Sequence, residues 1–351
     1  MLSSAPTVSP LKQHVSVLGA GAWGTALACA AHAHAPTLLW ARDATLVHTI
    51  NTQHASPRYL PGIQLPDALT CTASLLQALE HAQQGVAPGL LILGVPLAGL
   101  RALCEQVAAQ LTEKKPHLAG IIYTCKGLEA DSALLPSEIA HAGLKALDQF
   151  PTAVLSGPSF ALEVARGLPV ALTIASQAPA LRQAAIDALH GGNIRVYTSS
   201  DVLGVEVGGA LKNIMAIACG VGDGLGMGAN ARAALITRGL AEMTRFGEAL
   251  GAQAATFAGL TGLGDLVLTA TGDLSRNRQV GLAIGRGQAL DTLLASGLTA
   301  EGARCARAVR QRAQALGIEM PITEAVCNVL FEGVKPLEAV TRLLSRVATT
   351  E

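Results

Sequence analysis

The sequence is poor in charge. Only 14% of its 351 residues are Asp, Glu, Lys or Arg, against about 25% in an average soluble protein. Basic and acidic residues balance at 25 each, and no block of like charge occurs. Because nucleic-acid binding depends on clustered positive charge, no nucleic-acid partner is expected and a small-molecule ligand is favoured. Half of the residues are hydrophobic, so much surface should be buried in cores or between subunits, and a homodimer is expected.

The sequence also lacks paired cysteines. Its seven cysteines (29, 71, 104, 125, 219, 305 and 327) are odd in number and include no C-x-x-C pair. This pattern argues against a disulfide framework or a zinc knuckle, so no metal site is expected. Reduced thiols are typical of a reducing compartment, and we expect a cytoplasmic protein.

No membrane-spanning segment is expected, although one region imitates a secretory signal. Residues 13–41 contain no Asp, Glu, Lys or Arg, but this run carries three glycines that suit a ligand-binding turn better. The apolar run at 89–100 is short and is interrupted by two glycines and a proline. It is therefore a poor candidate for a membrane span.

Short apolar runs alternate with Ala- and Leu-rich stretches up to about residue 199. The runs lie at residues 14–21, 36–42, 89–96, 120–127, 152–158, 170–176 and 194–200. Their near-continuous apolarity predicts strands buried on both faces of a parallel, doubly wound α/β sheet. Ligands bind such sheets at the carboxyl ends of the strands.

The pattern changes at about residue 200. Helical periodicity dominates at 201–219, 233–250, 277–287, 302–316, 322–332 and 336–346, and "DLVLTA" (265–270) is the one remaining strand-like run. We therefore predict two domains, a dinucleotide-binding Rossmann-like domain at 12–199 and an all-α domain at 200–351 that carries the substrate and catalytic groups.

The stretch "VSVLGAGAWGTALA" contains a dinucleotide fingerprint. Gly19, Gly21 and Gly24 form G-x-G-x-x-G directly after a predicted strand and at the start of a helix. The first glycine allows a tight turn, the second allows pyrophosphate to approach the backbone, and the third allows the helix to pack closely on the strand. The alternative is a glycine-rich turn without a ligand.

The end of the next predicted strand bears on cofactor choice. An NAD-preferring site usually has an acid here for the ribose hydroxyls, but this sequence has Ala41 and Arg42, with Asp43 one residue later. A guanidinium suits the 2′-phosphate, so NADP is favoured while NAD remains possible. Alternatively, Arg42 is a solvated loop charge.

Histidine is absent after His190, so the second domain lacks the acid/base group that many hydroxy-acid dehydrogenases use. Lys212 is the natural replacement. In a helix, Lys212 would share one face with small or apolar residues, namely Val205, Gly208, Met215 and Cys219. Burial moves the pKa of a lysine toward neutrality, which suits a general acid or base. The alternatives are a lysine that reaches the surface or one that pairs with Glu206.

The stretch 259–278 suits recognition of phosphate. Asp265 lies among glycines, and Ser275, Arg276, Asn277 and Arg278 follow in a polar loop. Arginine binds phosphate oxygens in bidentate fashion. The alternative is a helix N-cap with surface arginines. Two further turns, at Lys126 in "TCKGLE" and at Gly157 and Ser159 in "SGPSFALE", are expected at the ligand-binding edge of the sheet.

These motifs together resemble the bacterial NAD(P)-dependent glycerol-3-phosphate dehydrogenases from about residue 13 to 346. The matching stretches are "GAGAWGTALA", "TCKGLE", "SGPSFALEVARGLP", "GLTGLGDLVLT", "SRNR" and the segment 204–243 around "LKN". The resemblance implies reversible reduction of dihydroxyacetone phosphate to sn-glycerol 3-phosphate for phospholipid synthesis. It also implies a helical domain like that at the C-terminus of 6-phosphogluconate dehydrogenase.

The resemblance further implies residue roles. Lys212 is expected to carry the proton and Asp265 to orient it. Substrate contacts are expected at Lys126, Gly157, Ser159, Lys212, Asp265, Ser275, Arg276 and Asn277. Besides the three fingerprint glycines, cofactor contacts are expected at Ala22, Trp23, Arg42, Lys126, Ala161, Arg276, Thr299 and Glu301.

Two departures from the family pattern occur: Ala22 replaces a frequent serine, and "LTAEG" replaces a more usual valine-rich version around Thr299. Two other functions stay open from the residues alone. One is a related two-domain reductase of a 2-keto or 3-hydroxy acid, whose substrate offers a carboxylate in place of phosphate. The other is a non-enzymatic dinucleotide sensor, which needs the fingerprint but not Lys212.

Overall fold

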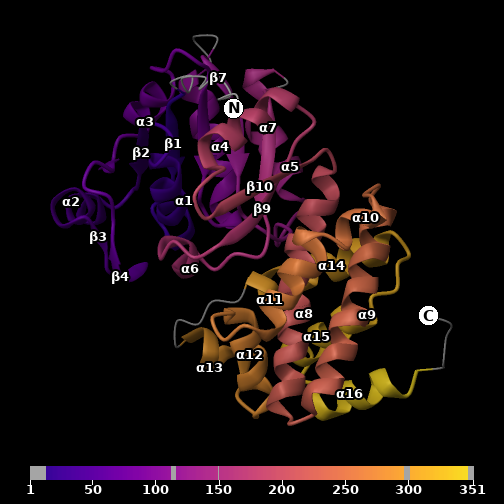
Figure 1. Cartoon of the computed structure of the whole chain (residues 1–351). Coiled ribbons are helices and arrows are strands. Elements are labelled where there is room, and N and C mark those ends of the chain that lie inside the picture. Colours follow the sequence, from indigo (N-terminus) through magenta and orange to yellow (C-terminus); the bar gives the residue numbers. More distant parts are fainter. Residues whose placement is uncertain (1–12, 112–115, 149, 296–300, 347–351) are drawn as a thin grey trace, which may run out of the picture.

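The computed structural model describes residues 13–111, 116–148, 150–295 and 301–346. The part before residue 200 forms a sheet flanked by helices, and the part after it is helical (Figure 1). This architecture confirms the predicted Rossmann-like α/β domain and helical C-terminal domain.

Within the described residues, the main sheet has eight strands in the order β10-β9-β8-β7-β6-β1-β2-β5. Their bounds are β1 Val15–Leu18, β2 Thr37–Trp40, β5 Thr70–Thr72, β6 Gly89–Leu93, β7 Leu118–Tyr123, β8 Thr152–Ser156, β9 Val170–Ala175 and β10 Ile194–Ser199. A small antiparallel hairpin, β3 (Ala55–Ser56) and β4 (Leu60–Gln64), lies outside this sheet.

The expectation of a wholly parallel sheet is wrong for two strands. β8 pairs with β9 in antiparallel fashion, and β10 runs parallel to β9. The runs 170–176 and 194–200 therefore end at the opposite edge from the other six strands. An apolar run reports burial on both faces but carries no information about strand direction, which is why the sequence did not reveal the reversal.

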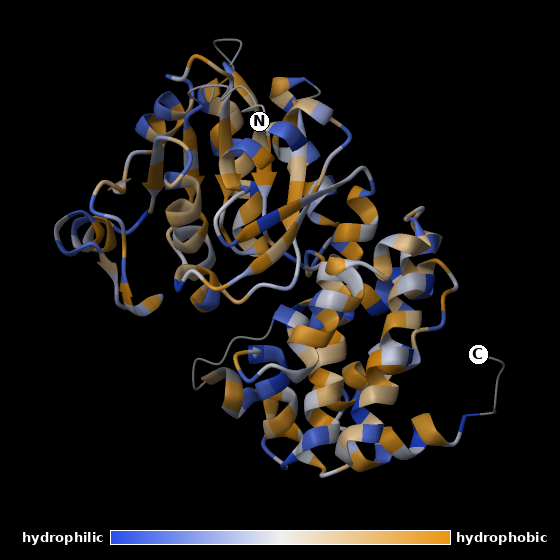
Figure 2. Cartoon of the chain, in the orientation of Figure 1, coloured by the Kyte–Doolittle hydropathy of each residue, from blue (hydrophilic) through white to orange (hydrophobic). Residues whose placement is uncertain are grey.

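Alternate side chains of each central strand enter two different cores. On β6, Leu90 and Ile92 face one core, whereas Leu91 and Leu93 face the other. Hydrophobic residues accordingly concentrate on the strands in Figure 2. The helices of this part are α1 Ala22–His32, α2 Ala44–Gln53, α3 Leu75–Ala82, α4 Leu97–Leu111, α5 Pro136–Gly143, α6 Ala161–Ala165 and α7 Pro179–Leu189, with a 3₁₀ turn η1 at Lys145–Leu147.

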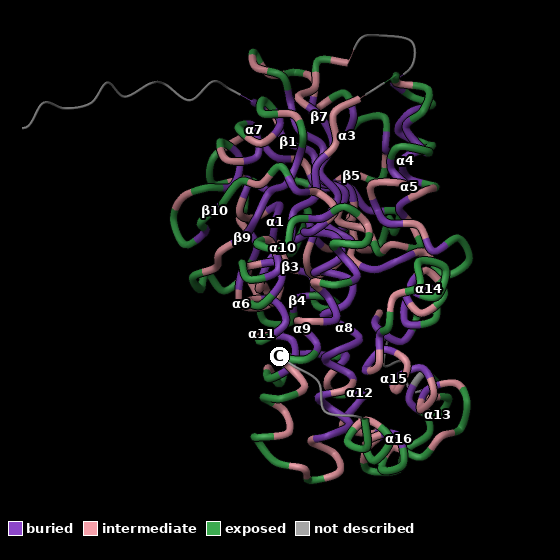
Figure 3. Tube along the Cα trace, turned by 90° about the vertical axis from the view of Figure 1, so that its right-hand side faces the viewer, coloured by how far each residue is buried: buried purple, intermediate pink, exposed green. Residues whose placement is uncertain are grey.

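One long helix, α8 (Val202–Gly224), forms the centre of the second part and is buried along most of its length (Figure 3). The other helices pack around it: α9 Gly228–Ala249, α10 Ala254–Phe257, the π-helix η2 Leu260–Gly264, α11 Asp265–Thr271, α12 Arg276–Gly285, α13 Leu290–Ala295, α14 Glu301–Ala315, α15 Pro321–Phe331 and α16 Pro336–Leu344.

The predicted strand at 265–270 is wrong, because these residues form α11. Asp265, Leu266, Thr269 and Ala270 are buried, whereas Val267 is 41% exposed. Burial at positions i, i+1, i+4 and i+5 is the spacing of a helix, and short apolar runs do not distinguish helix from strand.

Two helical segments among the described residues are long and apolar enough to cross a membrane by length and composition alone. One is α8, and 83% of its apolar window is buried inside the protein. The other, 254–271, consists of the three short helices α10, η2 and α11. The burial of α8 identifies it as the core helix of the helical part.

Candidate active site

Glycines on α8 allow this helix to come close to its neighbours at the site. A Cβ at Gly208 would lie 2.4 Å from the Thr261 carbonyl oxygen of η2, and one at Gly209 would lie 3.2 Å from the Lys126 side chain. Gly208 therefore needs the smallest side chain, and a larger residue at Gly209 would press on Lys126. The close approach brings Lys212, one turn further along α8, to the boundary between the sheet and the helical part.

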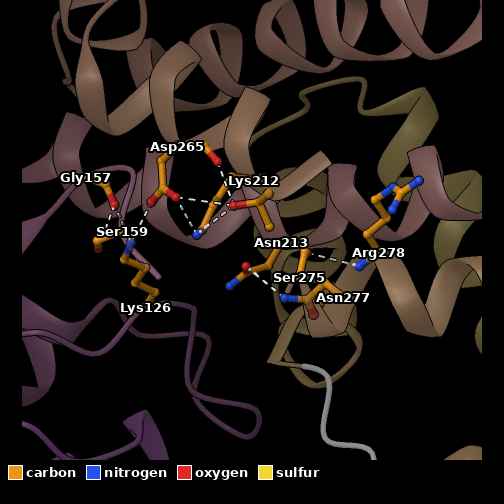
Figure 4. A network of polar contacts seen from close by, with 10 residues as sticks. Lys126, Gly157, Ser159, Lys212, Asn213, Asp265, Ser275, Asn277 and Arg278 are labelled. Atoms are coloured by element: carbon orange, nitrogen blue, oxygen red, sulfur yellow. Dashed lines mark hydrogen bonds and ion pairs between the residues drawn. The ribbon is translucent and has the colours of Figure 1, made fainter. Parts of the chain in front are cut away.

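Asp265 lies between two lysines (Figure 4). Its Oδ1 accepts a hydrogen bond from Lys212 Nζ at 2.7 Å, and its Oδ2 accepts one from Lys126 Nζ at 2.5 Å. The carboxylate is 1% exposed, and the side chains of Lys212 and Lys126 are 11% and 17% exposed. Charged groups buried to this extent require such pairing, because desolvating an unpaired charge is costly.

The alternative pairing of Lys212 with Glu206 does not occur, because Lys212 pairs with Asp265. Glu206 instead accepts hydrogen bonds from the backbone N–H and the hydroxyl of Ser137. Lys212 also donates to Thr269 Oγ1 at 3.0 Å, and this hydroxyl donates to the Asp265 carbonyl oxygen at 2.6 Å. Thr269 was missed from the sequence; its spacing of four residues from Asp265 on α11 is the signal that could have found it.

The surroundings of Lys212 bring its pKa close to neutrality. Burial lowers this pKa from 10.5 to about 8, and the Asp265 carboxylate limits the decrease. Burial alone would raise the pKa of Asp265, but Lys126 and Lys212 outweigh that effect and keep the pKa below its usual value. The pair therefore holds an ionised carboxylate beside an amine that exchanges a proton near physiological pH.

The end of β8 lies beside this pair. Lys126 Nζ is 3.4 Å from the carbonyl oxygen of Gly157, and the Ser159 hydroxyl donates to the same oxygen at 3.2 Å. Gly157 has φ +141°, a conformation that other residues rarely adopt. The structure thus brings together Lys126, Gly157, Ser159, Lys212 and Asp265, which come from four separate segments of the chain (Figure 4).

A second polar group extends from α8 to α12 and α14. Asn277 donates to Asn213 Oδ1 at 2.9 Å and accepts from the Gly302 backbone N–H at 3.0 Å. Asn213 follows Lys212 directly, and sequence reasoning missed it because a single amide carries no distinctive pattern. This chain of bonds attaches the "SRNR" segment to the helix that carries Lys212.

Parts of "SRNR" are engaged in contacts within the protein. Ser275 is the N-cap of α12 and accepts a hydrogen bond from the Arg278 backbone N–H at 3.2 Å. The Arg278 guanidinium pairs with Asp223 at 2.8 Å and with Asp273 at 3.0 Å. The interpretation of two guanidinium groups for phosphate is therefore wrong for Arg278, whereas Arg276 is exposed at the start of α12.

The three fingerprint glycines have three different surroundings. Gly19 has φ +124°, and a Cβ at Gly24 would lie 1.9 Å from the Gly19 carbonyl oxygen. Gly21 is the N-cap of α1 without a side-chain cap, and its missing Cβ would point into open space. Open space beside uncapped N–H groups at a helix N-terminus fits a pyrophosphate.

The remaining cofactor candidates lie on separate elements. Ala22 and Trp23 begin α1, and Ala161 begins α6, which packs against α1. Glu301 begins α14, close enough to Lys212 to contribute to raising its pKa. Arg42 is exposed after β2, and Thr299 lies outside the described residues.

Comparison with known families decides what this site belongs to. The family model described as the N-terminus of NAD-dependent glycerol-3-phosphate dehydrogenase matches residues 14–182, and that of the C-terminus matches residues 201–341. The chain belongs to this family. It is a dehydrogenase that acts on the CH–OH group of a phosphorylated polyol with a nicotinamide dinucleotide.

Solved structures of glycerol-3-phosphate dehydrogenases resemble the whole chain. That from Coxiella burnetii is 39% identical with a TM-score of 0.84, and the match covers 96% of this chain and 100% of the other. That from Saccharomyces cerevisiae is 25% identical with a TM-score of 0.80, covering 95% and 100%.

A probable 2-dehydropantoate 2-reductase from Bacillus subtilis is 12% identical with a TM-score of 0.51, covering 90% of this chain and 98% of the other. At this level of identity only the fold is shared. The comparisons therefore support glycerol-3-phosphate dehydrogenase over the keto-acid reductase and over a non-enzymatic sensor.

Proposed function

We propose that Lys212 is the group that carries the proton in the interconversion of dihydroxyacetone phosphate and sn-glycerol 3-phosphate. The observation that carries this proposal is a buried ammonium, paired with Asp265, whose pKa lies at about 8. An ammonium has three N–H donors. Two of them bond to Asp265 and Thr269, and the third has no partner among the described residues, so it is available for the substrate oxygen.

The residues around the fingerprint fit a dinucleotide, since the open space at Gly21 adjoins the uncapped N-terminus of α1. We assign its binding to Gly19, Gly21, Ala22, Trp23, Gly24, Arg42, Lys126, Ala161, Arg276, Thr299 and Glu301. When bound, the nicotinamide supplies or accepts the hydride. The chain supplies the proton: in reduction Lys212 Nζ protonates the oxygen that develops negative charge, and in oxidation the neutral amine removes that proton.

Asp265 orients Lys212 and stabilises its charged form in this mechanism. Lys126, Gly157 and Ser159 form the adjoining wall, and Ser275, Arg276 and Asn277 bind the substrate phosphate, where arginine supplies bidentate donors. Binding energy from that distant phosphate positions the carbonyl group. An Arg276→Gln variant should therefore raise KM for dihydroxyacetone phosphate and also lower kcat, and an unchanged KM would remove Arg276 from the phosphate site.

We propose a preference for NADP over NAD. Asp43, the acid nearest the expected ribose position, is the N-cap of α2 and accepts hydrogen bonds from the Thr45 and Leu46 backbone N–H groups at 2.9 and 3.3 Å. Its carboxylate is thus engaged in capping, while Arg42 is exposed beside it. An Arg42→Ala variant should lower kcat/KM for NADPH and leave that for NADH nearly unchanged. Equal losses with both cofactors would refute the preference.

Several broader assignments are also proposals. The end of β10 at Ser199 and the start of α8 at Val202 support a division into two domains, 12–199 and 200–351.

The seven free cysteines support a reducing, cytoplasmic location. The low charge and the leucines exposed on α16, Leu337 at 64% and Leu344 at 76%, support a homodimer. A role in glycerophospholipid synthesis follows from the product.

Turnover of dihydroxyacetone phosphate against ketopantoate, with each reduced cofactor, tests the substrate class. The site supports turnover of the phosphorylated ketone and little turnover of the keto acid. The opposite ranking would refute the assignment of substrate and phosphate site together.

A further inference from the structure

The helix that carries Lys212 passes from one hydrophobic core into another. Val205 belongs to the core on one face of the sheet, whereas Val207 belongs to the core of the helical part. Glu206 lies between them on α8 and is 3% exposed. An ionisable side chain is thus buried at the point where the two halves of the protein join.

Glu206 attaches α8 to the N-terminus of α5. Its Oε1 accepts a hydrogen bond from the Ser137 backbone N–H at 2.7 Å, and its Oε2 accepts one from the Ser137 hydroxyl at 2.6 Å. Ser137 is the second residue of α5. A carboxylate at this place satisfies a backbone N–H that lacks a partner within the helix and is favoured by the helix dipole.

The same carboxylate lies beside the end of β7. The hydroxyl of Tyr123, a residue with no exposed surface, is close enough to influence the pKa of Glu206. Three residues after Tyr123 the chain reaches Lys126. Glu206 therefore bonds to α5 and lies near the strand that leads to one lysine, while it belongs to the helix that carries the other.

We propose that Glu206 is a positioning residue for the reaction: anchored on Ser137, it holds α8 so that Lys212 meets Asp265 and Lys126. Lys212 lies six residues further along α8, about 9 Å at the helical rise of 1.5 Å per residue. If α8 shifted along its axis or rotated at Glu206, the Lys212 ammonium would therefore move with it. This inference rests on the proposed role of Lys212 as the proton carrier.

The chain offers a matched control in Glu242. This carboxylate is also 3% exposed and accepts the backbone N–H groups of Ile322 and Thr323 at 2.5 and 3.3 Å, where α15 begins. Burial raises the pKa of both Glu206 and Glu242 to about 7. The two residues therefore resemble each other in burial, charge and partners, but Glu242 is not at the junction with the sheet.

The test measures kcat and both KM values of Glu206→Ala, Glu206→Gln and Glu242→Ala, together with their unfolding temperatures. Glu206→Ala should lower kcat at least about tenfold, because displacement of a catalytic group by about 1 Å costs up to about a hundredfold. KM for the cofactor should change less than about twofold. Glu206→Gln should restore most of kcat, since an amide oxygen still accepts from Ser137 N–H and its NH₂ donates to the hydroxyl.

Glu242→Ala should lower the unfolding temperature but keep kcat within about twofold of the wild-type value. Equal effects of Glu206→Ala and Glu242→Ala on kcat would overturn the proposal, since they would show a purely structural role. If Glu206→Ala does not fold, Ser137→Ala removes one hydrogen bond and should lower kcat about threefold; an unchanged kcat would overturn the proposal. If the Lys212→Ala variant keeps wild-type turnover, the proposed proton-carrier role of Lys212 is refuted, independently of the result at Glu206.

Discussion

Replacement of Asp265 by asparagine removes the counter-charge of two lysines and keeps the shape of the side chain. The carboxylate lies 2.7 Å from Lys212 Nζ and 2.5 Å from Lys126 Nζ. Its negative charge raises the pKa of Lys212 against the larger effect of burial, and the balance leaves that pKa at about 8. Loss of the carboxylate should therefore lower the pKa of Lys212 further.

The size of the effect follows from the geometry. An opposite charge within about 4–6 Å shifts a pKa by about 1–3 units, so the pKa of Lys212 should fall to between about 5 and 7. At pH 7, about nine-tenths of Lys212 is protonated when its pKa is about 8, against about half at pKa 7 and about a hundredth at pKa 5. Reduction, which needs the ammonium, should slow between about twofold and ninetyfold at pH 7.

The assay is the pH profile of kcat for reduction of dihydroxyacetone phosphate, followed by absorbance of the reduced cofactor. In the wild type the rate should fall as pH rises through about 8, and in Asp265→Asn this decrease should move to lower pH. Asp223→Asn is the control, because Asp223 on α8 also bridges two cations, Arg232 and Arg278. If Asp265→Asn lowered kcat by the same factor at every pH, the electrostatic reasoning would be refuted.

Two further predictions concern stability. Gly24→Ala places a Cβ 1.9 Å from the Gly19 carbonyl oxygen and should lower the free energy of unfolding by about 1–3 kcal/mol. Gly21→Ala, with open space around its Cβ, should keep the wild-type stability but weaken cofactor binding. Equal unfolding temperatures of the two variants would contradict this. Burial, with a neighbouring histidine, lowers the pKa of His81 to about 4. Since the unfolded chain binds this proton first, stability should fall by about 1–2 kcal/mol between pH 6.5 and 4, allowing for solvent screening. The difference in unfolding free energy between wild type and His81→Gln, measured in urea at each pH, isolates this effect from the buried carboxyls Glu206 and Glu242. Their raised pKa values give a contribution of the opposite sign. A difference independent of pH would contradict the prediction.

The glycine-rich turn after β1 and the central helix could be predicted because their signals are local. Gly19 and Gly24 each meet a steric demand of a single strand-to-helix turn, whereas Gly21 has open space around it. Lys212 stood out because a cation on an otherwise small and apolar helix face has few explanations. Periodicity, which a helix of three or more turns displays clearly, located six helices after residue 200. The end of α8 and the start of α9 were each five residues off.

The parts that were missed depend on contacts between distant segments. The reversed direction of β9 and β10 depends on which strands pair, and an apolar run carries no information about that pairing. The helix α11 was mistaken for a strand because its apolar run spans only a few residues. The engagement of Arg278 with Asp223, 55 residues away, could not be read from "SRNR" alone, nor could the contacts of Lys212 with Thr269 on another helix.

Turnover by Lys212→Ala tests the central claim most directly. Binding of the reduced cofactor, measured by fluorescence titration, should be unchanged, while kcat for reduction of dihydroxyacetone phosphate should fall at least about a hundredfold, in line with the loss of a general acid. Retention of wild-type kcat in a folded, cofactor-binding Lys212→Ala protein would contradict the account.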